Sequence, residues 1–284
     1  MEEARPSHTA LRVAMRRAAH QLADHPKVLE DPIALKILGP GAIQRLEGGE
    51  GMGRDRLSMA LRAFMAARSR YAEDELARAI GRGTAQYVVL GAGLDTFAYR
   101  HPHAETALRV FEVDYPATQE WKRRQLAATE IAIPPSVTFA PVDFERQTLA
   151  DGLRDAGFDR GKAAFFSWLG VSMYLTEEVI AATLRFVASL PRGGGIVFDY
   201  MVPRESLGLI ERMALDALSR RVESTGEPFR TSFAPEALME WLMQIGFRSV
   251  EDLGPDEINA RYFKNRGDGL RVMGNVGRLI SAQK

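Results

Sequence analysis

The sequence lacks several features that would point to particular classes of protein. Its 284 residues include no cysteine, which excludes disulfide bonds, thiolate nucleophiles and zinc–thiolate sites. Neither sign of charge is in excess, since 37 Lys and Arg residues balance 37 Asp and Glu residues. A chain without net positive charge has no general basic field for nucleic acid or an anionic membrane, so we expect neither as a partner.

Long apolar runs and histidine-rich patterns are also missing. No uninterrupted apolar segment reaches the length of a transmembrane helix, and the first ten residues carry early acids without an apolar run. We therefore expect a cytoplasmic protein. The sequence has five histidines, none at a helical metal-ligand spacing, so we predict no metal site and assign no catalytic base.

The first third of the sequence has helical periodicity. Apolar residues at helical spacing predict helices over residues 8–22, 33–38 and 54–80. Between them, the stretch from Gly39 to Gly53 is rich in glycine, which predicts a flexible loop. We interpret residues 1–80 as a helical cover with this loop as its joint.

From residue 87 the pattern changes to short apolar strands that alternate with helices. Strands are predicted over residues 87–90, 108–113, 137–142, 163–168 and 195–200, with helices over 115–129, 147–156 and 176–190. This alternation is typical of a parallel sheet covered on both faces. Two later strands, 247–253 and 270–281, are expected to add an antiparallel pair. Residues 81–284 are therefore predicted to form an α/β domain with a Rossmann-like, mostly parallel sheet, continuous with the helical part.

The first predicted strand runs into the glycine turn Gly91-Ala92-Gly93. Such a turn lets a ligand approach the backbone closely, although it can also be only a tight connection. A phosphate-binding P-loop would need a lysine that is absent here, and a dinucleotide site would want a third glycine where this chain has Thr96. The remaining candidate is S-adenosylmethionine, which has no phosphate. Thr96 argues against a nicotinamide cofactor without excluding it.

Acidic residues end the next two strands. Asp114 follows Gly93 by 21 residues, the interval expected of an acid that binds ribose hydroxyls, though an aspartate there can equally cap the following helix. Asp143, at the end of the third strand, can accept from an adenine amine, and Phe144 can pack on the ring. Asp95, just after the glycines, either orients the turn or contacts the amino acid end of the cofactor.

Three motifs together carry a resemblance to a known family: Gly91-Ala-Gly-Leu-Asp-Thr96, Phe111-Glu-Val-Asp-Tyr-Pro116 and Val142-Asp-Phe144. They resemble the leucine carboxyl methyltransferase family, and more closely its bacterial branch of S-adenosylmethionine-dependent methyltransferases. The resemblance implies a class I methyltransferase fold with S-adenosylmethionine as the cofactor. It also implies that Arg68 binds the carboxylate of the cofactor, Gly91 the methionyl part, Asp114 the ribose, and Asp143 and Phe144 the adenine.

This chain departs from the family pattern at one position, and the resemblance does not identify the molecule that accepts the methyl group. Some members have an acid where this chain has Leu169, which affects any role carried by that acid. Tyr174 and Tyr200 follow or end strands at the carboxyl edge of the predicted sheet, where they border an acceptor pocket or simply pack beneath a loop. We expect O-methylation of a carboxyl or hydroxyl group on a small metabolite. The alternatives are a nicotinamide-dependent oxidoreductase and a non-catalytic cofactor-binding module. Oligomeric state is not indicated.

Overall fold

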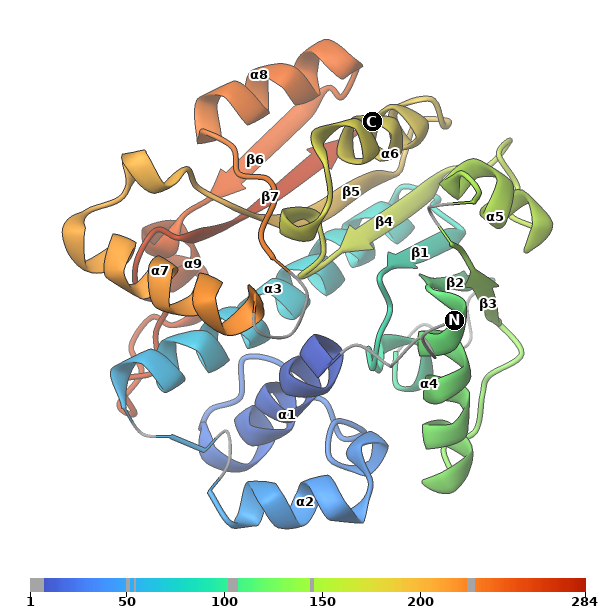
Figure 1. The fold of residues 1–284 in the computed structure, drawn as a ribbon. Coiled ribbons are helices and arrows are strands. Elements are labelled where there is room, and N and C mark those ends of the chain that lie inside the picture. Colours follow the sequence, from blue (N-terminus) through green and yellow to red (C-terminus); the bar gives the residue numbers. More distant parts are fainter. Residues whose placement is uncertain (1–7, 50–51, 54, 102–106, 144–145, 224–227) are drawn as a thin grey trace.

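A seven-stranded sheet forms the centre of the protein in a computed structural model, which describes residues 8–49, 52–53, 55–101, 107–143, 146–223 and 228–284 (Figure 1). The strands follow the spatial order β3-β2-β1-β4-β5-β7-β6. Strands β1 to β5 are parallel, and β7 pairs antiparallel with both β5 and β6. Their bounds are β1 Gln86–Leu90, β2 Arg109–Asp114, β3 Val137–Pro141, β4 Ala164–Trp168, β5 Gly195–Met201, β6 Ser249–Leu253 and β7 Gly277–Gln283.

The helices cover both faces of this sheet because alternate strand residues point to opposite sides. Val88 and Leu90 of β1 join an apolar cluster with α5, α6 and α8, whereas Tyr87 and Val89 join a cluster with α3 and α9. The bounds of the helices are α1 His8–Ala23, α2 Pro40–Glu47, α3 Arg56–Gly81, α4 Pro116–Ala128, α5 Leu149–Asp155, α6 Glu177–Ala188, α7 Leu209–Glu223, α8 Pro235–Ile245 and α9 Pro255–Tyr262. None of these described helices is both long and apolar enough to span a bilayer.

The N-terminal helices α1 and α2 lie together at the edge where the parallel strands end (Figure 1). They share a third apolar cluster with Leu94, just after the glycine turn, and with Leu126 of α4. Helix α3 behaves differently, because it packs on the sheet itself as one of its covering layers. Helix α3 is therefore one of the layers on the sheet, whereas α1 and α2 lie at its carboxyl edge. The helical cover over residues 1–80 stays a prediction.

The glycine-rich stretch was expected to be a flexible loop, and that expectation is wrong for most of its length. Residues Pro40–Glu47 form α2, with Pro40 in the first turn and Ala42 and Leu46 buried on one side. Proline suits the first turn of a helix, where its missing N–H leaves no bond unmade. The spacing of the apolar residues thus decides the structure of this segment: Gly39 and Gly48 cap the helix, and Gly41 is accommodated in its first turn.

The parallel strands and the antiparallel C-terminal pair confirm the predicted fold class. Helix α9 was not predicted, although Pro255 with Asp256 and Glu257 forms an ordinary helix start, in which the Glu257 carboxylate accepts from the Gly254 N–H at 2.9 Å. The last strand begins at Gly277 rather than at residue 270, because the preceding segment contains Gly274 with φ of +73°. Both differences lie away from the carboxyl edge of β1, β2 and β4.

Candidate functional site

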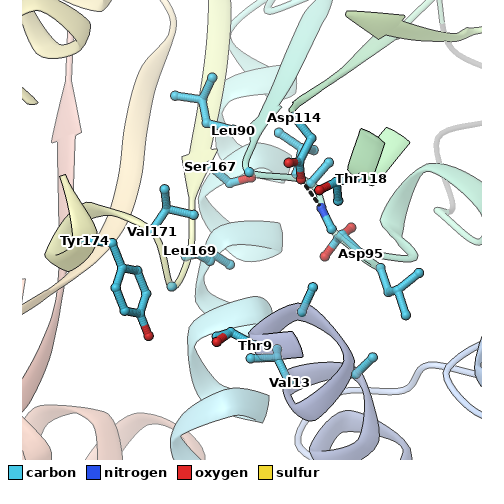
Figure 2. Close-up of a pocket in the computed structure, with 18 of the residues that line it drawn as sticks. Thr9, Val13, Leu90, Asp95, Asp114, Thr118, Ser167, Leu169, Val171 and Tyr174 are labelled. Carbon is cyan, nitrogen blue, oxygen red and sulfur yellow. Dashed lines mark hydrogen bonds between the residues drawn. The ribbon is translucent and has the colours of Figure 1, made fainter. Parts of the chain in front are cut away.

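A cavity of about 480 Å³ opens at the carboxyl edge of the sheet (Figure 2). Its walls come from the first half of α1, the glycine turn after β1, the end of β2 and the connection between β4 and α6. Pro228 and Arg230 complete the wall. In Figure 2, Asp114, Thr118 and Asp95 lie on one side of the space and Tyr174 on the other, with Leu169 and Val171 near Tyr174. Open parallel sheets bind ligands at this edge.

The glycine turn has a backbone conformation that other residues rarely adopt. Gly91 has a φ of +66° and Gly93 a φ of +42°. A Cβ atom on Gly91 would lie 2.4 Å from Cγ2 of Val171, and one on Gly93 would lie 3.0 Å from Cβ of Ala10. Side chains at these positions would collide with the β4–α6 connection and crowd α1. The absence of a side chain therefore lets two other walls of the cavity approach the turn.

Asp114 ends β2 beside this turn. Its Oδ2 accepts from the Gly93 N–H at 2.6 Å, the bond drawn in Figure 2, and its Oδ1 accepts from the Tyr115 N–H at 2.7 Å. Burial raises the pKa of Asp114 above its ordinary value, and the two backbone N–H groups offset only part of that increase. No cation pairs with this carboxylate among the described residues. Each oxygen still has a lone pair for a further donor, such as a ribose hydroxyl.

Asp95 is held by charges from the N-terminal segment. The Asp95 Oδ2 atom lies 3.2 Å from Nη1 of Arg17, and its Oδ1 accepts from the Phe97 N–H at 2.8 Å. Burial acts to raise the pKa of Asp95, but the positive charges of Arg17, Lys122 and Arg100 outweigh it and hold the pKa below its ordinary value. Asp95 is therefore ionised and orients the turn.

Arg17 also contacts residues that do not line the cavity. It pairs with Asp31 at 3.1 Å and donates to the Thr96 hydroxyl at 2.8 Å, and that hydroxyl donates to Asp31 at 2.6 Å. Arg100 lies 3.2 Å from the same aspartate. Asp31 is fully buried and Arg17 nearly so. Thr96, which occupies the place of a third glycine, thus fastens the glycine turn to the N-terminal segment.

Arg68 reaches the cavity from α3. Its Nη1 donates to Asp199 Oδ2 at 2.7 Å, and the other oxygen of Asp199 accepts from the Gly170 N–H at 2.5 Å. A Cβ on Gly170 would lie 2.9 Å from both terminal nitrogens of Arg68, so this glycine leaves room for the guanidinium. Asp199 occupies one nitrogen of Arg68, and the others have no partner among the described residues. They can donate to a ligand carboxylate.

The other predicted residues are not all brought to the cavity. Tyr174 lines it, beside a ring of Phe229 at 5.4 Å. Asp143 lies at the tip of β3 outside the lining, within 3.4 Å of Arg146, and Phe144 falls outside the described residues. Tyr200 is buried and donates to Asp252 at 2.7 Å, a position away from the cavity. Burial and the Asp252 charge raise the pKa of Tyr200.

Sequence reasoning missed Asp199, Arg17 and Asp31 as parts of the site. Asp199 had a detectable signal, since a charged residue within the apolar strand β5 needs a buried partner. Arg17 and Asp31 lie far from the glycine turn in sequence, and nothing in the spacing indicates that they meet it. Arg17 and Asp31 contact the turn only because α1 and the segment after it pack against Asp95 and Thr96.

The arrangement fits the cofactor expected from the sequence. The glycine turn lines the cavity and exposes backbone at Gly91, Asp114 offers acceptors for a ribose diol, and Arg68 offers donors for a carboxylate. These three features stand in the order needed by one extended molecule with a nucleoside at one end and an amino acid at the other. Nothing about them requires a phosphate.

Comparison with known proteins gives the same answer. Residues 10–188 match the family model described as leucine carboxyl methyltransferase. A Bacillus subtilis protein named "Putative S-adenosyl-L-methionine-dependent methyltransferase YktD" is 33% identical over an alignment of 305 positions, gaps included. The alignment covers 100% of both chains. A Saccharopolyspora erythraea protein with the same description is 30% identical, covering 97% of this chain and 94% of its own.

Solved structures agree on the fold. A DUF574 family protein from Streptomyces avermitilis superposes with a TM-score of 0.55 at 15% identity, covering 98% of each chain. A Thermobifida fusca structure described as a "putative methyltransferase" gives a TM-score of 0.55 at 16% identity, covering 100% of this chain and 96% of the other. At these identities the likeness concerns the fold alone, which is that of the class I methyltransferases.

Proposed function

Since this chain belongs to the leucine carboxyl methyltransferase family and is an S-adenosylmethionine-dependent methyltransferase, we propose that it methylates an oxygen atom of a small-molecule acceptor. Of the two oxygen groups expected from the sequence, we favour a carboxylate. The nicotinamide alternative is not favoured, because Thr96 takes the place of the third glycine and is bonded to Asp31 and Arg17.

The observation that carries this proposal is that the described lining of the cavity holds no histidine and no carboxylate free of other bonds. The two carboxylates of this lining are committed elsewhere, Asp95 to Arg17 and Asp114 to the backbone of the glycine turn. A carboxylate acceptor is already ionised at neutral pH and needs no proton removed, whereas an alcohol would need a base. The site therefore suits a carboxylate better than a hydroxyl group.

Binding and orientation are the contributions we assign to the chain. Asp114 would hold the ribose hydroxyls, Gly91 and Gly93 would admit the methionyl part, and Arg68 would bind the cofactor carboxylate while Asp199 fixes its direction. When bound, S-adenosylmethionine supplies a methyl group on a positively charged sulfur, which leaves as a neutral thioether once the acceptor oxygen has taken the methyl. Holding two reactants in line can supply roughly 7–11 kcal/mol of barrier lowering without acid–base chemistry.

A small acceptor is favoured because α1 forms one wall of the cavity. Ala10 of α1 packs directly against Gly93, Val13 also lines the cavity, and Arg17 ties the helix to the glycine turn. We propose that α1 and α2 act as the cover that keeps water from the reacting atoms. A macromolecular acceptor would have to reach the methyl group past this cover.

The test is transfer of a labelled methyl group. The purified protein would be incubated with S-adenosylmethionine carrying a tritiated methyl group and with small-molecule fractions of a bacterial extract. We expect labelled products that release volatile methanol in mild base, as methyl esters do and methyl ethers do not. Label that stays base-stable would refute the carboxylate proposal. Binding of S-adenosylhomocysteine without any transfer would favour the non-catalytic module.

A further inference from the structure

One charged residue of the cavity has no role in the cofactor arrangement. Among the described lining residues, Arg17, Arg68 and Asp95 have ion-pair partners and Asp114 is bonded to the glycine turn. Arg230 also lines the cavity, yet its side chain has no ion pair and no hydrogen bond within the part of the chain that the structure describes. It is an exposed cation at the mouth of the cavity, with no counter-ion among those residues.

The backbone holds Arg230 at this place. Its N–H donates to the Met173 carbonyl at 2.8 Å, and the hydroxyl of Thr231 donates to another carbonyl of the β4–α6 connection. Met173 belongs to a short 3-10 helix that also carries Tyr174. The Phe229 ring lies 5.4 Å from the Tyr174 ring, so the residues on both sides of Arg230 are anchored to this connection. The position of Arg230 is therefore set by the same segment that forms the cavity wall.

The surroundings of Arg230 differ from those of Arg68. The Tyr174 ring, which packs beside Phe229, is the lining side chain that the chain holds next to Arg230 (Figure 2). Arg68 lies instead beside Gly170, where Asp199 holds it. An apolar wall with one unpaired cation at its mouth matches a ligand that has an apolar body and an anionic group.

We propose that Arg230 is a specificity-determining residue, which selects acceptors that carry an anionic group on an apolar body. This inference rests on the proposed function, because it assigns the end of the cavity beyond Arg68 to the acceptor. The apolar body packs against the ring of Tyr174, and the anionic group pairs with Arg230. A neutral molecule of the same shape keeps the packing and loses the ion pair.

The experiment measures binding of small probes to protein saturated with S-adenosylhomocysteine. Hexanoate, hexanamide and butanoate would be titrated by ligand-observed NMR against the unmodified protein, Arg230→Leu and Arg192→Leu. Arg192 is the matched control, since it is also exposed without a described partner but lies before β5, at the opposite edge of the sheet. Leucine keeps an apolar side chain at either position and removes the charge.

We expect hexanoate to bind about fivefold more tightly than hexanamide, as a partly exposed ion pair provides. Hexanoate should also bind about tenfold more tightly than butanoate, because two more methylene groups are buried. Arg230→Leu should abolish the preference for hexanoate over hexanamide, and Arg192→Leu should keep it. Affinity for S-adenosylhomocysteine should change by less than about twofold in both variants.

Each other result has a separate meaning. Equal binding of hexanoate and hexanamide, no binding of any probe, or a preference that persists in Arg230→Leu would overturn the role of Arg230 and leave the methyltransferase proposal standing. A loss of S-adenosylhomocysteine affinity in Arg230→Leu would also overturn it, since Arg230 would then be a cofactor residue. Failure of the unmodified protein to bind S-adenosylhomocysteine would instead refute the proposed function.

Discussion

The two ends of the cavity are built in different ways. At the glycine turn, the conformations of Gly91 and Gly93 are fixed, Asp114 is bonded to the backbone, and Arg17 connects the turn to α1. At the other end, the described wall consists of apolar side chains and the unpaired Arg230. The first end depends on backbone geometry and buried charge, so few substitutions are tolerated there. The second depends on side-chain surfaces, which can change without disturbing the fold.

The largest effect is expected from Arg17→Met at the first end. The substitution removes the cation that pairs with both Asp31 and Asp95, and removing one partner of a buried ion pair costs about 3–5 kcal/mol of the free energy of unfolding. Because Arg100 still lies beside Asp31, we expect the lower end of this range. Urea unfolding followed by circular dichroism would measure the loss. Arg12→Met, on the same helix, is the control and should change stability by less than about 0.5 kcal/mol. Equal stability of the two variants would contradict the proposed fastening of α1 to the turn.

Asp114→Asn should weaken cofactor binding next most strongly. Replacing a carboxylate that accepts ribose hydroxyls removes charge-assisted hydrogen bonds, which are worth about 1.5–3 kcal/mol, or roughly 10- to 150-fold in affinity. Titration calorimetry with S-adenosylhomocysteine would measure the change. Asp143→Asn is the comparison, and we expect an effect below about threefold because Asp143 does not line the cavity. An equal loss of S-adenosylhomocysteine affinity in both variants would support the adenine contact predicted for Asp143.

The pH dependence of cofactor affinity should follow the raised pKa of Asp114. Ribose binding favours the ionised form, so affinity should be constant above this pKa and fall about tenfold per pH unit below it. The fall should begin at a higher pH than for an ordinary aspartate, whose pKa is about 3.9. Calorimetry across this pH range would show it, and Asp114→Asn should lose the dependence. An unchanged dependence in that variant would assign the titration to another group.

The same shift has the opposite sign for the stability of the empty protein. Because folding raises the pKa of Asp114, its contribution to stability is fully present below the unfolded value and is lost as the pH rises through the folded one. Cofactor binding and folding therefore favour different protonation states of one residue. The ionised form of Asp114, which binds the ligand, therefore lowers the free energy of unfolding of the empty protein.

The smallest effect on binding is expected from Tyr200→Phe. Tyr200 lies outside the cavity, so affinity for S-adenosylhomocysteine should stay within about twofold of the unmodified value. Stability should fall by about 0.5–1.5 kcal/mol, because the hydrogen bond to Asp252 is lost while Arg278 still pairs with that carboxylate. Thermal unfolding and calorimetry would measure both. A marked loss of cofactor affinity would return Tyr200 to the site.

The same contrast explains how much the sequence could predict. The strand ends, the glycine turn and Asp114 follow from local patterns, because strand length and spacing place them at one edge of the sheet. A buried charge at Asp199 could be detected, but its partner Arg68 could not, since the two are 131 residues apart in the chain. The contact of Arg17 with Asp95 could not be predicted either, because 78 residues separate them. The glycine-rich stretch misled for a physical reason, because Pro40 and the apolar residues after it stabilise α2 despite the glycines on both sides.

A crystal structure with bound S-adenosylhomocysteine tests the central claim most directly. We predict that its ribose hydroxyls contact Asp114, its carboxylate contacts Arg68, and its sulfur lies beside Gly91, facing the space bounded by Tyr174 and Arg230. The acceptor end would then begin where the cofactor stops. A cofactor with its carboxylate on Arg230, or one that fills the space beside Tyr174, would contradict the division of the cavity into two ends.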